Sequence, residues 1–97
     1  MEKLAQVTLR NEKTPQNSST LDAYIEANGD LVLDGCNAGA STKAQFDDYD
    51  YEYTRRVRAQ HLPLVLLELI KDRFDSDVSF AEWLTSKNIP DEFESWI

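Results

Sequence analysis

Cysteine, proline, glycine and long apolar runs are all scarce in this 97-residue sequence. Its single cysteine, Cys36, cannot form a disulfide within the chain, which favours a reducing compartment such as the cytoplasm. Three glycines and three prolines beside 41% hydrophobic residues argue against collagen-like, low-complexity and wholly disordered chains. No apolar run approaches the roughly 18 residues of a membrane helix, and residues 1–4 lack the pattern of a secretory signal. We therefore expect neither a membrane span nor export.

Length and charge set the next limits. A chain of 97 residues has room for one domain, so we expect a single domain over residues 1–97. Eighteen acidic residues against ten basic ones give a net charge of −8. Such a surface repels nucleic acid and anionic lipid, so we expect no direct binding to either and favour a basic protein partner. The alternative is that the charge only keeps a small protein in solution.

Alternating apolar and polar residues predict strands in the first half of the chain. An opening strand is expected over residues 4–10. The polar residues 11–20, which include Pro15, are expected to form a loop.

The clearest strand pattern follows this segment. Residues 21–26 alternate strictly, and Asn28-Gly29 supplies two residues that tolerate the positive φ of a type I′ turn. Residues 31–33 then return as the second strand of a hairpin. The segment 35–39, with a glycine at each end, is expected to break the strand pattern.

A further strand is expected over residues 51–58. Its aromatic and β-branched residues favour a strand, with Tyr51, Tyr53, Arg55 and Val57 on one face. A short helix is also expected over residues 42–46, although these residues have poor helix propensity.

Two helices are expected in the last third of the chain. Pro63 suits the first turn of a helix, and residues 64–70 are apolar around most of its circumference, which predicts a central core helix. Ser79 and Glu82 have the spacing of a capping box at the start of a second helix. Asn88 suits the left-handed position that ends it. The apolar end of the tail is expected to dock on the core.

These elements predict an α+β fold. A small antiparallel sheet, made of the hairpin and two further strands, is expected to pack on the two C-terminal helices.

Groups able to support catalysis are few. Cys36 and His61, the only thiol and the only imidazole, would suit a nucleophile and its base, but isolated residues of these types are more often structural. We therefore expect a non-enzymatic protein with no catalytic residue. Carboxylates that alternate along a strand form a row and not a cage, and one cysteine and one histidine cannot complete a zinc site, so we expect no metal and no cofactor.

One basic cluster lies at Arg55, Arg56 and Arg58. Interleaved with tyrosines, these arginines could stack on and pair with RNA bases. Four acidic residues lie between positions 47 and 52, directly beside them. Pairing of the arginines with nearby acids is therefore the favoured interpretation.

An acidic, aromatic segment is the strongest candidate for a binding site. Carboxylates steer a cationic partner towards a surface, and tyrosines provide rigid amphipathic contact area. Crowded carboxylates repel one another, and a binding function would explain why that cost is tolerated. The alternative is that the tyrosines pack on the sheet and the aspartates form a solvated loop. The predicted partner-binding residues are Asp47, Asp48, Tyr49, Asp50, Tyr51 and Glu52.

Several short runs also resemble a group of small acidic bacterial single-domain proteins. The runs are residues 29–35 (Gly-Asp-Leu-Val-Leu-Asp-Gly), 50–53 (Asp-Tyr-Glu-Tyr), 89–93 (Ile-Pro-Asp-Glu-Phe) and Ser95-Trp96. The resemblance implies a bacterial, cytosolic, single-domain protein and transfers no functional residue. In size and charge the chain is also similar to the immunity proteins that neutralise toxins.

The sequence therefore predicts a cytoplasmic, non-enzymatic, acidic protein-binding module. Its most concrete form is an immunity protein or inhibitor that docks on a basic, nuclease-like partner or toxin. One alternative is a small enzyme or ligand-binding domain that uses Cys36, His61 and Arg55. Another is a homodimeric structural module.

Overall fold

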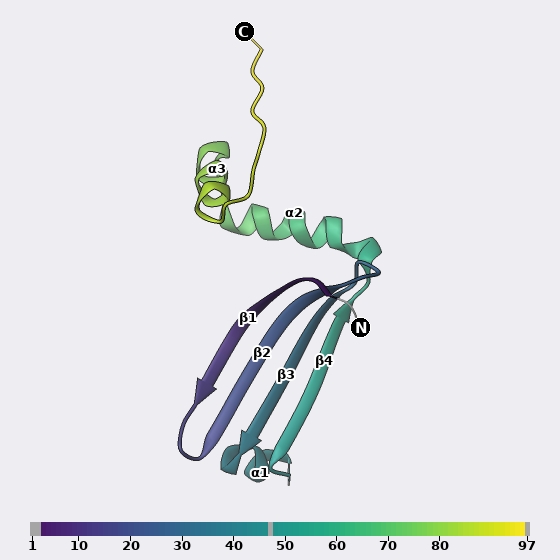
Figure 1. The fold of residues 1–97 in the computed structure, drawn as a ribbon, viewed down its shortest axis with the longest axis vertical. Helices are drawn as coiled ribbons and strands as arrows, with labels where there is room; N and C mark the ends of the chain where they lie inside the picture. Colours follow the sequence, from purple (N-terminus) through teal and green to yellow (C-terminus); the bar gives the residue numbers. More distant parts are fainter. Residues whose placement is uncertain (1–2, 47, 97) are drawn as a thin grey trace. The chain divides into compact units, whose positions relative to one another are not determined.

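The computed structural model describes residues 3–46 and 48–96 (Figure 1). It divides the chain into two compact units, Met1–Leu62 and Pro63–Ile97. The first unit holds a four-stranded antiparallel sheet and the second holds the C-terminal helices, which confirms the α+β fold. The single domain over 1–97 and the packing of helices on the sheet stay predictions.

The sheet is a simple meander in which each strand pairs with the next along the chain. Its strands are β1 (Lys3–Lys13), β2 (Asn17–Glu26), β3 (Leu31–Gly39) and β4 (Asp50–Val57), in the order β1-β2-β3-β4. Strands β1 and β4 are therefore the two edges.

The expected loop over residues 11–20 is wrong, because most of it is strand. Only the turn between β1 and β2 departs from the ladder, and Thr14 closes it: its Oγ1 accepts a hydrogen bond from the Asn17 N–H at 3.0 Å. Cross-strand bonds satisfy the polar side chains beyond the turn, as where Ser19 Oγ donates to Asn37 Oδ1 at 2.7 Å. Backbone pairing between long strands thus outweighs the polar composition of this segment.

The hairpin of β2 and β3 is confirmed, but its turn is not type I′. Gly29 has a φ of +93°, whereas Asn28 is not among the described residues with positive φ. The Gly29 N–H donates to the Glu26 carbonyl at 2.8 Å, and the Glu26 N–H donates to the Asp30 carbonyl at 2.9 Å. This is the pattern of a three-residue turn that a left-handed glycine closes as a bulge.

Gly35 continues β3 where the sequence suggested a break, because it makes room for an aromatic ring. It lies opposite Tyr53 in the register, and a Cβ at Gly35 would lie 2.1 Å from the Tyr53 ring. The Tyr53 hydroxyl accepts a hydrogen bond from Arg10 Nη2 at 3.2 Å. The ring thus covers the glycine and links the two edges of the sheet.

The described residues also form four helical segments. Helix α1 (Ala40–Phe46) follows β3 at one end of the sheet, which confirms the short helix expected there. A 3₁₀ turn, η1 (Ala59–His61), leads into α2 (Leu62–Arg73), and α3 (Asp77–Ser86) follows. Across the described residues, no helix is long and apolar enough to cross a membrane.

Both ends of α3 are capped, and the sequence located only one of them. The helix begins two residues before Ser79, with Ser76 as N-cap, whose Oγ accepts from the Ser79 N–H at 3.1 Å. Ser76 and Ser79 therefore replace the expected capping box. At the other end Asn88 has the predicted left-handed φ of 59°, and the Ile89 N–H donates to the Leu84 carbonyl at 2.9 Å.

Little apolar surface is buried. Val32, in β3, is the buried hydrophobic residue among those described. No described side chain of α2 is buried within the helical unit itself, and the expectation that this helix packs on the sheet as a central core helix stays a prediction. The tail was expected to dock, but Phe93 is exposed and Trp96 is 86% exposed; Ile97 lies outside the described residues.

We predict that Gly35→Ala destabilises the sheet by about 1–3 kcal/mol, because the added methyl group displaces the Tyr53 ring. Thermal and urea unfolding measure the loss. In a Tyr53→Ser background the same change should cost much less, since the ring is then absent. An equal cost in both backgrounds would contradict the assigned contact.

Candidate functional site

An ion-pair cluster joins the end of β4 to the hairpin of β2 and β3. Arg56 binds Glu26 through two parallel bonds, Nη1 to Oε2 at 2.6 Å and Nη2 to Oε1 at 3.0 Å. The Glu26 side chain is only 4% exposed, so its charge depends on this partner. Two-pronged pairing of this kind is the strongest geometry available to an arginine and a carboxylate.

Asp30 is the second acid of the cluster, and three residues between positions 56 and 59 donate hydrogen bonds to it. Its Oδ1 accepts from the Ala59 N–H at 2.8 Å. Its Oδ2 accepts from Arg56 at 3.2 Å and from Arg58 at 3.0 Å. The hairpin turn therefore holds the chain where it leaves the sheet.

These contacts shift the acids towards the charged form. The Arg56 hydrogen bonds lower the pKa of Glu26 below its ordinary value, against the opposing effect of burial. The Ala59 N–H, followed by the arginines, lowers the pKa of Asp30. The carboxylate partners, Glu26 first, raise the pKa of Arg56. All three groups are thus charged at neutral pH, and with Arg58 as the second arginine the two acids of the cluster are neutralised.

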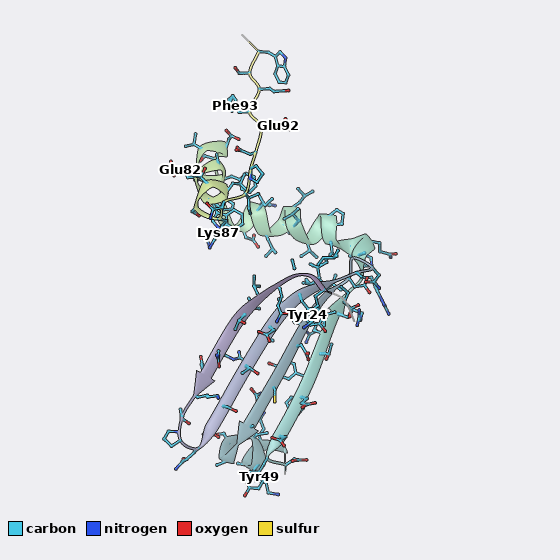
Figure 2. All side chains as sticks on the ribbon, viewed as in Figure 1. Tyr24, Tyr49, Glu82, Lys87, Glu92 and Phe93 are labelled. Carbon is cyan, nitrogen blue, oxygen red and sulfur yellow. The ribbon has the colours of Figure 1, made fainter. Side chains whose placement is uncertain are left out.

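The predicted acidic segment lies at the opposite end of β4. Asp47 lies outside the described residues. Asp48 and Tyr49 precede the strand, and Figure 2 shows Tyr49 at the α1 end of the sheet, away from Tyr24. Asp48 Oδ1 accepts from the Asp50 N–H at 3.2 Å, which orders the entry into the strand.

The register separates the carboxylates of this segment from its tyrosines. Asp50 pairs with Ala38 and Glu52 with Cys36, so both acids share one face of the sheet. Tyr51 lies between them on the other face, where its ring is 5.6 Å from that of Tyr53. Since β4 is an edge strand, a partner at this edge would reach both groups.

Two further acids extend the carboxylate face, and sequence reasoning missed them. Asp22 and Asp34 lie directly opposite each other on β2 and β3, with Thr8 and Thr54 completing the row across the sheet. Thr8 Oγ1 donates to Asp22 at 2.8 Å and Thr54 Oγ1 donates to Asp34 at 3.3 Å. The alternation in residues 21–26 already predicts which face of the strand Asp22 lies on. That Asp22 lies directly opposite Asp34 follows only from the pairing register of β2 and β3.

Four carboxylates on β2, β3 and β4, all on this side of the sheet, make up what we call the acidic face. Within the described part of the chain none of them forms an ion pair, because the salt bridges there join Arg56 and Arg58 to Glu26 and Asp30. On β1, the residue in line with Asp50 across the sheet is the basic Lys13. It lies three strand spacings, or about 14 Å, from Asp50. The expected neutralisation of the β4 acids by nearby arginines is therefore wrong for the described ones. The acidic face consists of Asp22, Asp34, Asp50 and Glu52.

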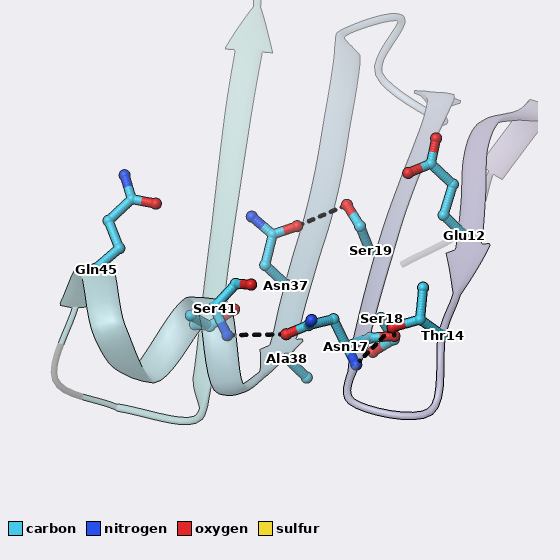
Figure 3. A pocket seen from close by; sticks show the side chains of 10 residues that line it. Glu12, Thr14, Asn17, Ser18, Ser19, Asn37, Ala38, Ser41 and Gln45 are labelled. Atoms are coloured by element: carbon cyan, nitrogen blue, oxygen red, sulfur yellow. Dashed lines mark hydrogen bonds between the residues drawn. The ribbon is translucent and has the colours of Figure 1, made fainter.

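A polar pocket of about 200 Å³ lies between α1 and the end of β1 (Figure 3). Its wall carries hydroxyl and amide groups and one carboxylate, Glu12. Two of its contacts are internal: the Ser41 N–H donates to Asn17 Oδ1 at 2.8 Å, and Ser19 donates to Asn37. These groups support the α1 end of the sheet.

The structure does not bring together the three groups of the enzyme alternative. Val57, the last residue of β4, pairs with Leu31 on β3. Cys36 lies five residues further along β3, which separates it from Leu31 by about 16 Å of strand. His61 follows that end of β4, so it is distant from the thiol. Arg55 projects from the opposite face to Cys36, because its partner in the register is Leu33. Among the described residues, no three acidic, thiol or imidazole groups are arranged to hold a metal.

We predict that Arg56→Gln lowers the melting temperature at neutral pH much more than Arg55→Gln, because only Arg56 leaves a buried carboxylate without its partner. Since the folded-state pKa values of Glu26 and Asp30 are lowered, their contribution is complete above the ordinary values of 4.5 and 3.8 and is lost as the pH falls below them. The gap between wild type and Arg56→Gln should therefore narrow at pH values under about 3.8. Circular dichroism melts at fixed protein concentration measure both effects, and a gap that is independent of pH would contradict them.

Searches of protein-family models, curated proteins and solved structures find no match to the chain. The resemblance to small acidic bacterial proteins therefore stays a prediction.

Proposed function

We propose that this protein is a non-enzymatic, acidic binding module of a bacterial cytoplasm. It docks a basic protein on the acidic face, and the most concrete partner is a nuclease-like toxin that it inhibits, as an immunity protein does. The predicted segment at the start of β4 supplies one end of this surface, and Asp22 and Asp34 supply the other.

The opposition of Asp22 and Asp34 is the observation that carries the proposal. Like charges directly across two strands destabilise a sheet. The Cβ atoms of such a pair are about 5 Å apart, and the threonine hydroxyls beside the two acids carry no positive charge. A cationic partner would convert this repulsion into attraction on binding.

The allocation of the arginines supports the same conclusion. Arg56 lies on the same face as Glu52, yet both its Nη atoms bind carboxylates of the hairpin. Asp50 and Glu52 are left exposed at an edge strand, where their field reaches solvent. An uncompensated negative surface raises the rate at which a cationic protein associates.

The tyrosines divide between two roles. Tyr53 is half-buried over Gly35 and serves the sheet, as the packing alternative expected. Tyr49 is 61% exposed at the edge beside Asp48 and Asp50, where it could anchor a docked partner. We therefore assign partner contact to Tyr49 together with the acidic face.

We predict that Asp50→Asn/Glu52→Gln slows association with the captured partner severalfold at low salt and less at high salt. Immobilised protein would first capture basic proteins from bacterial lysate for identification by mass spectrometry. Association rates with the purified partner would then be measured by biolayer interferometry over a range of salt. The matched control is Asp75→Asn/Glu82→Gln, which removes the same two charges from exposed positions in the helical unit.

Equal slowing by both double variants would show that the net charge of the protein, and not the acidic face, controls association.

The stability of Asp34→Asn provides a second arm of this experiment. Removing one of two opposed carboxylates should raise the stability of the sheet by roughly 0.5 kcal/mol while it weakens binding. A variant that binds at the wild-type rate would overturn the assignment of the face.

A further inference from the structure

The helical unit leaves an apolar groove open. Its volume is about 760 Å³, and its walls come from α2, from α3 and from Ile89 beyond α3. At one end the Phe74 and Phe80 rings meet edge to face at 5.3 Å, and Trp83 stacks near Phe80 at 6.3 Å. On α2 the groove is lined by Leu66 and Leu69, which are 59% and 61% exposed.

Such a unit needs support that its own residues do not supply. Residues 63–97 amount to 35 positions, and units below about 40 residues usually need disulfides, metals or oligomerisation. No cysteine or histidine occurs in this part of the sequence, since Cys36 and His61 both precede it. No cluster among its described residues could hold a metal either, so burial of the groove against a further protein surface is the remaining support.

The charges of the groove favour a second copy of this chain as the occupant. Asp72 and Arg73 are the charged groups among the described residues that line it, one of each sign and adjacent in sequence. A two-fold axis beside them brings each acid against the partner's base, because a two-fold interface is self-complementary. The charged residues of α2 (Glu68, Lys71, Asp72 and Arg73) also sum to zero in a chain of −8, so this helix adds no net charge repulsion between two copies.

We infer that the protein is a homodimer in which the α2–α3 grooves of two copies close on each other. The contact forms a four-helix arrangement with Leu66, Leu69, Phe80 and Trp83 at its centre. Its residues belong to the unit Pro63–Ile97, whereas the acidic face belongs to the unit Met1–Leu62.

The first test compares equal substitutions on two faces of one helix. At 3.6 residues per turn, Leu64 lies on roughly the opposite side of α2 from Leu66 and Leu69, and at 63% it is about as exposed as Leu69. Light scattering after size exclusion should give wild type and Leu64→Glu twice the chain mass of 11.1 kDa. Leu69→Glu should give a monomer, because dimerisation would bury two unpaired carboxylates. A monomeric wild type at every concentration, or equal behaviour of the two variants, would overturn the inference.

If Leu69→Glu unfolded the helices, its monomeric mass would say nothing about the groove. A second test therefore reverses the charges that line the groove. Asp72→Arg and Arg73→Asp should each be monomeric alone, since each places like charges across the two-fold axis. An equimolar mixture should form a heterodimer, which native mass spectrometry detects. A mixture that stays monomeric would overturn the groove-to-groove arrangement.

Discussion

Arg56 determines how the charges of the sheet are distributed. By binding Glu26 through both Nη atoms and reaching Asp30 as well, it ties the end of β4 to the hairpin of β2 and β3. The cluster neutralises the two buried acids of the sheet with residues of the same chain. Folding therefore commits Arg56 and Arg58 at this end of β4, and the acids at the other end of the strand receive no counter-charge from them.

The acidic face follows from that commitment. Asp22 and Asp34 oppose each other across the middle strands, and Asp50 and Glu52 continue the same face at the edge. A sheet selected only for stability would not place two carboxylates directly opposite each other. We interpret the cost as one that binding of a cationic partner offsets.

The sequence predicted those elements whose signals are local. Strict alternation located the hairpin, and the parity of Tyr51 and Tyr53 matched their common face in β4. Asn88 marked the end of α3 correctly. Polar residues 17–20 and the segment from Gly35 to Gly39 were missed as strands, because ladder bonds to neighbouring strands and the Tyr53 ring decide their conformation. The opposition of Asp22 and Asp34, like the choice of Glu26 by Arg56, depends on a register that local patterns do not contain.

A double-mutant cycle on the free energy of unfolding tests this account most directly. Arg56→Gln is combined with Glu26→Gln in one cycle and with Glu52→Gln in another, since both acids share a face with Arg56. The account predicts strong coupling of Arg56 to Glu26 and additive effects for Arg56 and Glu52. Coupling of Arg56 to Glu52 as strong as that to Glu26 would show that the acidic face is already neutralised within the chain, and would contradict it.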